Sequence, residues 1–388
     1  MICDSNVKPV QNSGSAQMNS AEDLRVAAFD HVRGLAVIFM IVSHVALMFG
    51  SAEAAATSIG RFMNDFCGTA PAAPVFMLLM GIFMIFPGEK RAGLLFCRGL
   101  KLFVLGLLLN VVRMVIPFFL LSIFVPAEFD HMCAMLQVSR GEVYWRIFYN
   151  VDILGFAGAA CMLIAALSTV FKKAWHWVLA GSATIVAAPY LWGRGEELGA
   201  FFYLLQPLWG RQFAEGVPTD TAFPVFPWLI FPILGLIIGR LLKDGLESAR
   251  LAGLLLRISL LTGSVGAVLV WKYGMSQFGD YYRMYPGGTL LVVTFAALWT
   301  ALFLWLAEFA WLRAKLDRLV FWSRHITLIY FVQWFIFGFS VLFLYFRRID
   351  NPWVLVALTP LSLWLTWLLT RLCLASSPLM RFFRWFTR

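Results

Sequence analysis

One arginine and one histidine in the first hydrophobic segment are the residues best placed to carry chemistry. Arg33 stands at the start of an apolar run, and His44 follows eleven residues later inside it. At about 100° and about 1.5 Å per residue, a helix puts both side chains on one face, about 16 Å apart. That depth is about half of a bilayer's hydrocarbon core. Because an ionisable group is costly there, and because histidine titrates near neutral pH, His44 is a candidate functional residue.

Further polar side chains lie inside or beside later apolar segments. Asp152 lies just inside the fourth segment, and Arg113 lies twelve residues into the third, with Asn110 one turn before it. Arg113 either extends along its aliphatic stem to the outer surface or lines a polar cavity. His325 lies at the start of the ninth segment, where a functional role and a packing role are both open.

Two aromatic runs precede later segments on the same predicted face. Tyr281–Pro286 contains Arg283 and Tyr285, and Phe223–Trp228 precedes the sixth segment. Together with Asp152, these aromatic side chains and one arginine are similar to the mouth of a sugar-binding site. Aromatic residues are also ordinary at membrane interfaces, so interfacial packing is the alternative for each run.

The elements that must position these residues are membrane-spanning helices. Of the 388 residues, 61% are hydrophobic and only 13% are charged, whereas soluble domains carry about 25% charged residues. We therefore predict an all-α polytopic membrane protein. Its ten expected spans cover residues 33–50, 71–87, 101–122, 149–171, 174–192, 223–242, 251–275, 286–307, 322–346 and 352–374.

The basic residues predict the orientation of these spans. Twenty-one of the 31 Lys and Arg side chains fall on the side of the N-terminus, and ten fall on the other. The positive-inside rule then places both termini in the cytoplasm, which an even number of spans allows. The net charge of +10 follows from these flanks and does not indicate a nucleic-acid partner. The predicted organisation is a disordered tail over 1–24 without a cleavable signal peptide, one transmembrane domain over 25–375 and a basic cytoplasmic tail over 376–388.

Several classes of site are not supported by any motif. The sequence has no Walker A motif, no dinucleotide-binding glycine fingerprint, no HExxH motif and no nucleophile elbow. No pair of its six cysteines has metal-ligand spacing. We therefore expect no metal cofactor.

Three segments carry motifs whose order and spacing agree with those of a known protein family. The first runs from Arg25 through Asp30-His31-Val32-Arg33-Gly34 to His44, the second is Phe223–Trp228 followed by Gly235, Gly239 and Arg240, and the third is Arg324–Tyr330. They resemble the transmembrane acyltransferases that include heparan-α-glucosaminide N-acetyltransferase and its bacterial relatives, and the related acyltransferase-3 membrane proteins. The Arg-x10-His arrangement of the first segment is that of the acyltransferase-3 group.

This resemblance implies that an acyl group, usually acetyl, moves from cytoplasmic acyl-CoA to a carbohydrate hydroxyl or amine on the other side of the membrane. It implies that His44 is a general base or takes the acyl group itself. The CoA phosphates would meet a basic rim, to which we assign Arg33, held by Asp30, together with Arg98, Lys101, Arg240 and Arg324. The acceptor would meet Asp152, Trp228, Arg283, Tyr285, Arg113 and His325.

One departure and two alternatives stay open. Many relatives end the third motif with a histidine where this chain has Gln333, and glutamine keeps hydrogen bonding but does not titrate. A transporter or flippase for a polar envelope precursor would use His44 as a proton relay and Arg113 in a substrate path. A structural or assembly role would require that Arg33 and His44 both tolerate substitution. The expected location is a bacterial inner membrane; the acceptor, the acyl group and homo-oligomer formation stay open.

Overall fold

The computed structural model describes residues 13–85, 92–212, 219–343 and 347–387, and within them the chain forms helices without named strands. The longer helices, with the two short elements that continue them, are α1 (Ser13–Phe49), α4 (Ala73–Ile85), α5 (Ala92–Asn110), the π-helix η2 (Val111–Val115), α6 (Ile116–Phe124), α9 (Ile153–Val170), α10 (Ala174–Leu191), α12 (Val225–Trp228), α13 (Ile230–Lys243), α14 (Ser248–Tyr273), α15 (Pro286–Leu306), α18 (Ile326–Phe343) and α19 (Pro352–Ala375). The all-α prediction is confirmed.

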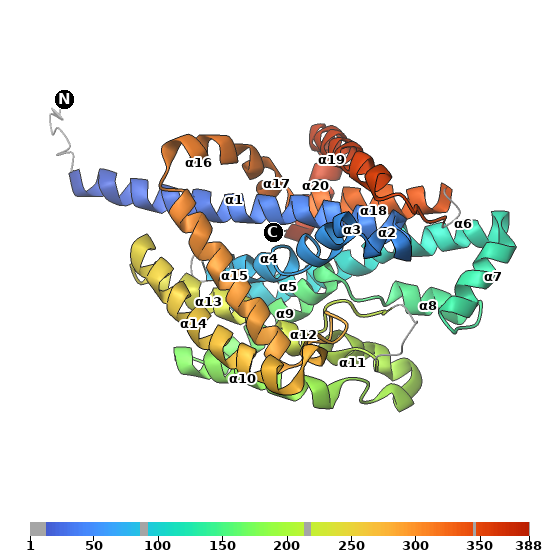
Figure 1. Cartoon of the computed structure of the whole chain (residues 1–388), viewed down its shortest axis with the longest axis horizontal. Coiled ribbons are helices and arrows are strands. Elements are labelled where there is room, and N and C mark those ends of the chain that lie inside the picture. The colour runs from blue at the N-terminus through green and yellow to red at the C-terminus, as the bar shows by residue number, and fades with distance from the viewer. Residues whose placement is uncertain (1–12, 86–91, 213–218, 344–346, 388) are drawn as a thin grey trace, which may run out of the picture.

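Shorter helices complete the described part of the chain. They are α2 (Ala52–Ala56), α3 (Ser58–Arg61), η1 (Phe62–Phe66), α7 (Pro126–Met135), α8 (Glu142–Phe148), η3 (Glu196–Phe201), α11 (Phe202–Trp209), η4 (Met275–Phe278), α16 (Ala310–Leu316), η5 (Asp317–Leu319), α17 (Val320–Arg324) and α20 (Ser377–Thr387). Helices α6, α7 and α8 lie together at one end of the molecule, and α1 begins at the other end (Figure 1).

The predicted count of ten spans is not confirmed. Seven helical stretches in the described residues are long and apolar enough to cross a membrane, and an eighth forms if the pair Ala310–Arg324 and Ile326–Ser340, bent by 72°, counts as one span. The two other predicted segments are also helical. Helix α4 is a shorter apolar helix, and α10 is not among the seven. A polytopic membrane protein is therefore supported with fewer spans of full length.

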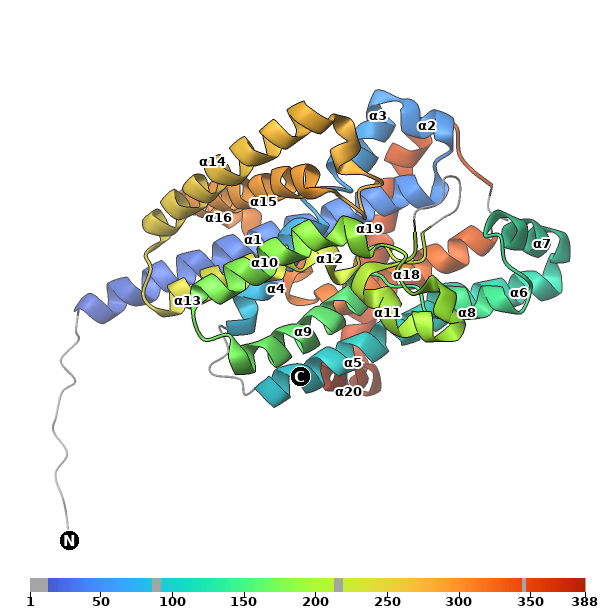
Figure 2. The same cartoon turned by 90° about the horizontal axis from the view of Figure 1, so that it is seen from below.

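Helical structure extends into both of the predicted tail segments. Of the predicted tail over 1–24, residues 1–12 lie outside the described residues, whereas the backbone from Ser13 onward already belongs to α1. The basic segment over 376–388 is mostly helix α20, which packs against α5 and α19. Figure 2 shows α20 beside α5.

The spacing of Gly235 and Gly239, a GxxxG pair within one apolar segment, predicts close helix packing, and the structure confirms it. A Cβ atom added to Gly235 would lie 1.9 Å from the carbonyl oxygen of Leu78, so α13 touches the backbone of α4. Only a residue without a side chain permits this approach.

Helix α14 presents a row of exposed apolar side chains that suits contact with lipid, among them Leu256, Leu260, Leu261, Val265 and Val268.

Candidate functional site

His44 faces one side of helix α18 near the middle of the molecule. The Nδ1 atom of its ring contacts Nε2 of Gln333 through a hydrogen bond, and Gln333 is fully buried. The ring centroids of His44 and Trp334 lie 4.6 Å apart, and Phe337 meets the histidine ring edge-on at 6.3 Å. His44 itself is only partly buried, and its Nε2 atom has no hydrogen-bond partner among the described residues. One ring nitrogen is therefore held while the other is left for a ligand.

A buried ion pair contacts Trp334, the residue that packs on the His44 ring. Arg113 and Asp152 lie 3.2 Å apart, and their side chains are 3% and 6% exposed. The guanidinium carbon of Arg113 lies 4.6 Å from the ring centre of Trp334, a cation–π geometry. The hydroxyl of Tyr330 donates to the same carboxylate at 3.0 Å. The contacts from His44 through Trp334 and Arg113 to Asp152 thus join four elements: α1, α18, η2 and α9.

The local sequence explains how Arg113 reaches this position. Pro117 lacks the N–H that would bond to the Arg113 carbonyl in an α-helix, and the chain widens into the π-helix η2 just before it. The Arg113 backbone also approaches α18 closely, because a Cβ atom on Gly338 would lie 2.5 Å from its carbonyl oxygen. Wide π-turns of this kind are frequent at functional sites.

Asp152 is fixed by its position at the start of α9. It is the N-cap residue, and its Oδ1 accepts hydrogen bonds from the backbone of Leu154 and Gly155 at 3.0 and 3.1 Å. Asn110 closes the arrangement, because its amide donates to the carbonyls of Phe148 and Asn150 while its oxygen accepts from Arg113. The Asp152 carboxylate is therefore held by three hydrogen bonds and by its ion pair with Arg113.

A second polar cluster lies nearer the start of α1. Arg33 donates to Asp30 at 2.8 Å and to Ser323 at 2.7 Å, and the Ser323 hydroxyl donates to Asp30 at 2.5 Å. The Arg33 guanidinium also lies 4.5 Å from the ring centre of Phe83. The predicted contact between Asp30 and Arg33 is confirmed, and Ser323 adds a link to α17.

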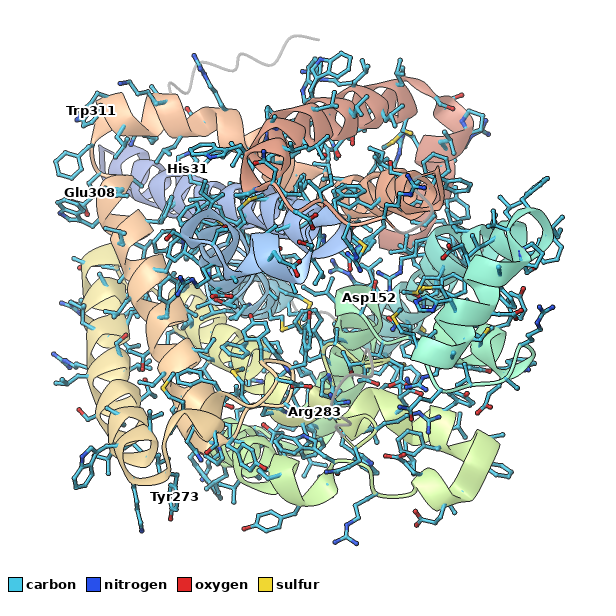
Figure 3. The ribbon with its side chains drawn as sticks, turned by 45° about the vertical axis from the view of Figure 1, so that its right-hand side comes forward. His31, Asp152, Tyr273, Arg283, Glu308 and Trp311 are labelled. Carbon is cyan, nitrogen blue, oxygen red and sulfur yellow. The ribbon has the colours of Figure 1, made fainter. Side chains whose placement is uncertain are left out.

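Neighbouring side chains extend this second cluster. The fully buried His31 contacts Asp317 at 2.9 Å. Arg324 is exposed one residue after Ser323, and His325 is half-buried beside Phe321 at the break between α17 and α18. His325 follows Ser323 by two residues and is therefore a neighbour of the Arg33 cluster. Figure 3 shows Asp152 well apart from His31, which lies toward the side of Trp311 and Glu308.

The remaining basic side chains of the predicted rim are spread over other helices. Lys101 lies on α5, with its ammonium 4.9 Å from the ring centre of Trp385 on α20. Arg98 lies one turn before Lys101 and has a buried Nε without a partner among the described residues. Arg240 lies over Trp177 at 5.5 Å. Lys101 and Arg240 are therefore held by contacts separate from the Arg33 cluster.

The aromatic runs proposed as a sugar-binding mouth are closely packed. Arg283 is 4% exposed; it binds Asp280 at 2.8 Å and donates to the carbonyl of Arg211. Trp228 is fully buried and donates its indole N–H to the carbonyl of Tyr282. Tyr285 is more exposed and meets Trp192 edge-on. These contacts describe packing, and a role in acceptor binding stays a prediction.

Three residues of the two clusters were given no role in the site from the sequence, although Tyr330 and Gln333 belong to the third motif. Tyr330 and Gln333 lie one turn apart on the face of α18 that meets His44, a spacing that the continuous apolar run hid. Ser323 bridges Asp30 and Arg33 from 290 residues away. In the described residues, no group of three His, Cys, Asp or Glu side chains is arranged to hold a metal ion.

Comparison with known proteins supports the acyltransferase-3 part of the resemblance. The acyltransferase-3 family model, described as an acyltransferase domain, matches residues 26–371. No curated protein and no solved structure matches the chain, and the likeness to heparan-α-glucosaminide N-acetyltransferase is not confirmed. The match begins just before Asp30, passes His44 and Arg113, and ends beyond Gln333, so it includes both polar clusters. The chain therefore belongs to the acyltransferase-3 family of membrane acyltransferases.

Proposed function

We propose that this protein transfers an acyl group, most simply acetyl, from acyl-CoA to a carbohydrate hydroxyl or amine, with His44 as the catalytic residue. The observation that carries the proposal is the state of the His44 ring. Its Nδ1 is held by Gln333, and its Nε2 has no partner among the described residues. The family supplies the reaction class.

In the proposed step, Nε2 of His44 removes the proton from the acceptor O–H or N–H. The acceptor atom then attacks the carbonyl carbon of the thioester. The carbon–sulfur bond breaks, an ester or amide forms, and the leaving thiolate takes the proton from the imidazolium. In a second version, Nε2 attacks the thioester first, and the resulting acyl-histidine passes its acyl group to the acceptor. Both versions need Nε2 unprotonated in the neutral ring, which requires the Gln333 amide turned so that its oxygen accepts from Nδ1–H.

The Arg33 cluster is the proposed contact for the CoA phosphates. Arg33 is oriented by Asp30 and Ser323, which fixes its guanidinium, and the exposed Arg324 lies next to Ser323 in the chain. Arginine forms paired hydrogen bonds to phosphate oxygens, so two such side chains suit a CoA diphosphate. With about 16 Å of helix between Arg33 and His44, the pantetheine arm would extend along α1 toward the histidine.

Arg113 and Asp152 fit a positioning role better than direct acceptor binding. Each uses its hydrogen bonds on neighbours within the protein, and both are almost fully buried. A sugar hydroxyl would have to displace one of these contacts. The pair instead fixes Trp334, which packs on the His44 ring. Of the other acceptor candidates, Tyr285 is the exposed one.

The proposed direction is outward from the cytoplasm. The excess of basic residues on the N-terminal side favours cytoplasmic termini and thus a cytoplasmic position for Arg33. The acceptor would then be a glycan or sugar on the outer side of a bacterial inner membrane.

The test is an acyl-transfer assay on membranes that contain the full chain. Labelled acetyl-CoA is supplied, and label on envelope saccharide is measured for the wild type, for His44→Gln and for His131→Gln. His131 is exposed on α7, so its replacement is the matched control. We expect His44→Gln to lower the rate by about 10²–10⁴-fold, the usual contribution of a general base, and the control to keep it. Normal transfer by a normally expressed His44→Gln protein would refute the proposal, and saccharide export without label would favour the transporter.

A further inference from the structure

A basic surface pocket lies where α20 meets α5, apart from both polar clusters. Its volume is about 300 Å³, and it is lined by Lys101, Arg381, Arg384 and Trp385. The Lys101 ammonium lies over the Trp385 ring at 4.9 Å. Figure 2 shows α20 beside α5, and the two helices are in contact. We call this site the α5–α20 pocket.

The positive charges of the pocket are not neutralised by the protein. Among the described residues, no carboxylate forms an ion pair with Lys101, Arg381 or Arg384. Arg384 uses its Nε on the backbone carbonyl of Met380, which leaves its two terminal nitrogens available. Three cations around one concavity repel each other unless an anion lies between them. A phosphate group suits such a set of donors.

The surroundings of the pocket are apolar and exposed, as a surface in contact with lipid would be. On α5, Leu100, Val104 and Leu108 are exposed at intervals of four residues, which makes a strip along one face. On α20, Leu379 and Phe382 are also exposed.

Helix α20 is held against the bundle by its opposite face. Phe383 and Phe386 are buried, and the Phe383 ring packs on Phe331 of α18 at 5.3 Å. The helix therefore has a face fixed to the protein and a face that carries both arginines. A helix of this type, with basic and exposed apolar side chains together, suits the boundary between headgroups and acyl chains.

We propose that the α5–α20 pocket binds the phosphodiester headgroup of an anionic membrane lipid, with an acyl chain along the strip formed by Leu100, Val104 and Leu108. Free phosphate compounds share the anionic chemistry but gain nothing from that strip. The assignment is independent of the acyl-transfer proposal, because it rests on α5 and α20 alone.

The test uses the full chain in detergent and native mass spectrometry with dioleoyl phosphatidylglycerol, against dioleoyl phosphatidylcholine. The wild type should retain the anionic lipid preferentially. Arg381→Gln/Arg384→Gln should lower that preference about tenfold or more, because each basic side chain contributes to anionic lipid binding. The matched control is Arg250→Gln/Arg257→Gln, which removes the same charge from exposed positions on α14 and should keep the preference.

A second variant guards against a folding defect in α20. Lys101→Gln removes one pocket charge from α5 and should lower the preference in the same direction. Equal retention by all variants, or an equal loss in the α14 control, would overturn the proposal. Displacement of the bound lipid by equimolar CoA, together with loss of CoA binding in the Arg381→Gln/Arg384→Gln protein, would assign the pocket to the acyl donor and would also overturn it.

Discussion

Replacement of Asp152 by asparagine tests whether the buried ion pair supports the site. The carboxylate accepts three hydrogen bonds, two from the backbone of α9 and one from Tyr330, and it forms an ion pair with Arg113 at 3.2 Å. Asparagine has the same shape and keeps an oxygen for the N-cap contacts. Its amide nitrogen would then face the Arg113 guanidinium, so that two donors meet. Asp152→Asn therefore removes the charge while it spares the helix cap.

The expected cost follows from the burial of both partners. Breaking a buried ion pair by removal of one charge costs about 3–5 kcal/mol, because the remaining charge is left without compensation. Removal of both charges leaves no unpaired charge in the interior. We therefore expect Arg113→Gln/Asp152→Asn to be less destabilised than the sum of its single variants by about 2 kcal/mol, in the usual range for contacting residues.

Two measurements check this expectation. Reversible unfolding in mixed micelles, followed over a titration with denaturing detergent, gives the free energy of unfolding for the single and double variants. Acyl transfer gives kcat, which should fall by about tenfold or more in Asp152→Asn even in protein that stays folded, since small displacements of a catalytic group are costly. The displacement would pass from Arg113 through Trp334 to the His44 ring.

The matched control is Asp130→Asn. Asp130 carries an exposed ion pair with Arg140, so the same chemical change should leave unfolding and kcat near wild-type values. The reasoning is refuted if Asp152→Asn unfolds at the wild-type detergent concentration, or if the single-variant free energies add in the double variant.

Other perturbations have equally direct outcomes. Gly235→Val should prevent accumulation of folded protein because the valine side chain would collide with the backbone of α4. Gly253→Val should be tolerated because the space around Gly253 is open. Fluorescence-detected size exclusion will measure the amount of folded protein for both variants. Arg33→Lys should raise the KM for acyl-CoA more than it lowers kcat, since lysine cannot keep both side-chain contacts of the arginine. The Arg140 guanidinium holds the pKa of Asp130 below its usual range. This contact therefore stabilises α7 at and above about pH 4, and the stabilisation is lost as the pH falls through the lowered pKa. Hydrogen exchange of α7 across that pH interval will measure the loss.

Helical periodicity was sufficient to predict that Arg33 and His44 lie on one helix. Both residues lie on the single continuous helix α1, and the contact between Arg33 and Asp30 is local, so nothing outside this segment was needed. The close packing at Gly235 was likewise predicted from spacing within one helix. Such features depend on residues within a few turns of each other.

The residues around His44 could not be predicted in the same way. Gln333 and Tyr330 lie 289 and 178 positions from the partners they bind, and tertiary packing alone brings them together. The predicted count of ten spans is not confirmed, for a related reason. Hydropathy registers an apolar run, but it does not register that α4 is short or that the chain bends by 72° between Arg324 and Ile326.

Gln333 stands where the resemblance of the third sequence motif leads us to expect a histidine. It contacts Nδ1 of His44, so this difference acts on the ring that we propose to be catalytic. With its amide nitrogen toward the ring, Gln333 favours the tautomer that carries its proton on Nε2. With the amide turned, its oxygen accepts from Nδ1–H and Nε2 becomes the free base. The Gln333 oxygen is buried without a partner in the first arrangement, and the second gives it one. A glutamine fits general-base chemistry at Nε2 without a titrating group of its own, so loss of the second histidine does not remove the proposed activity.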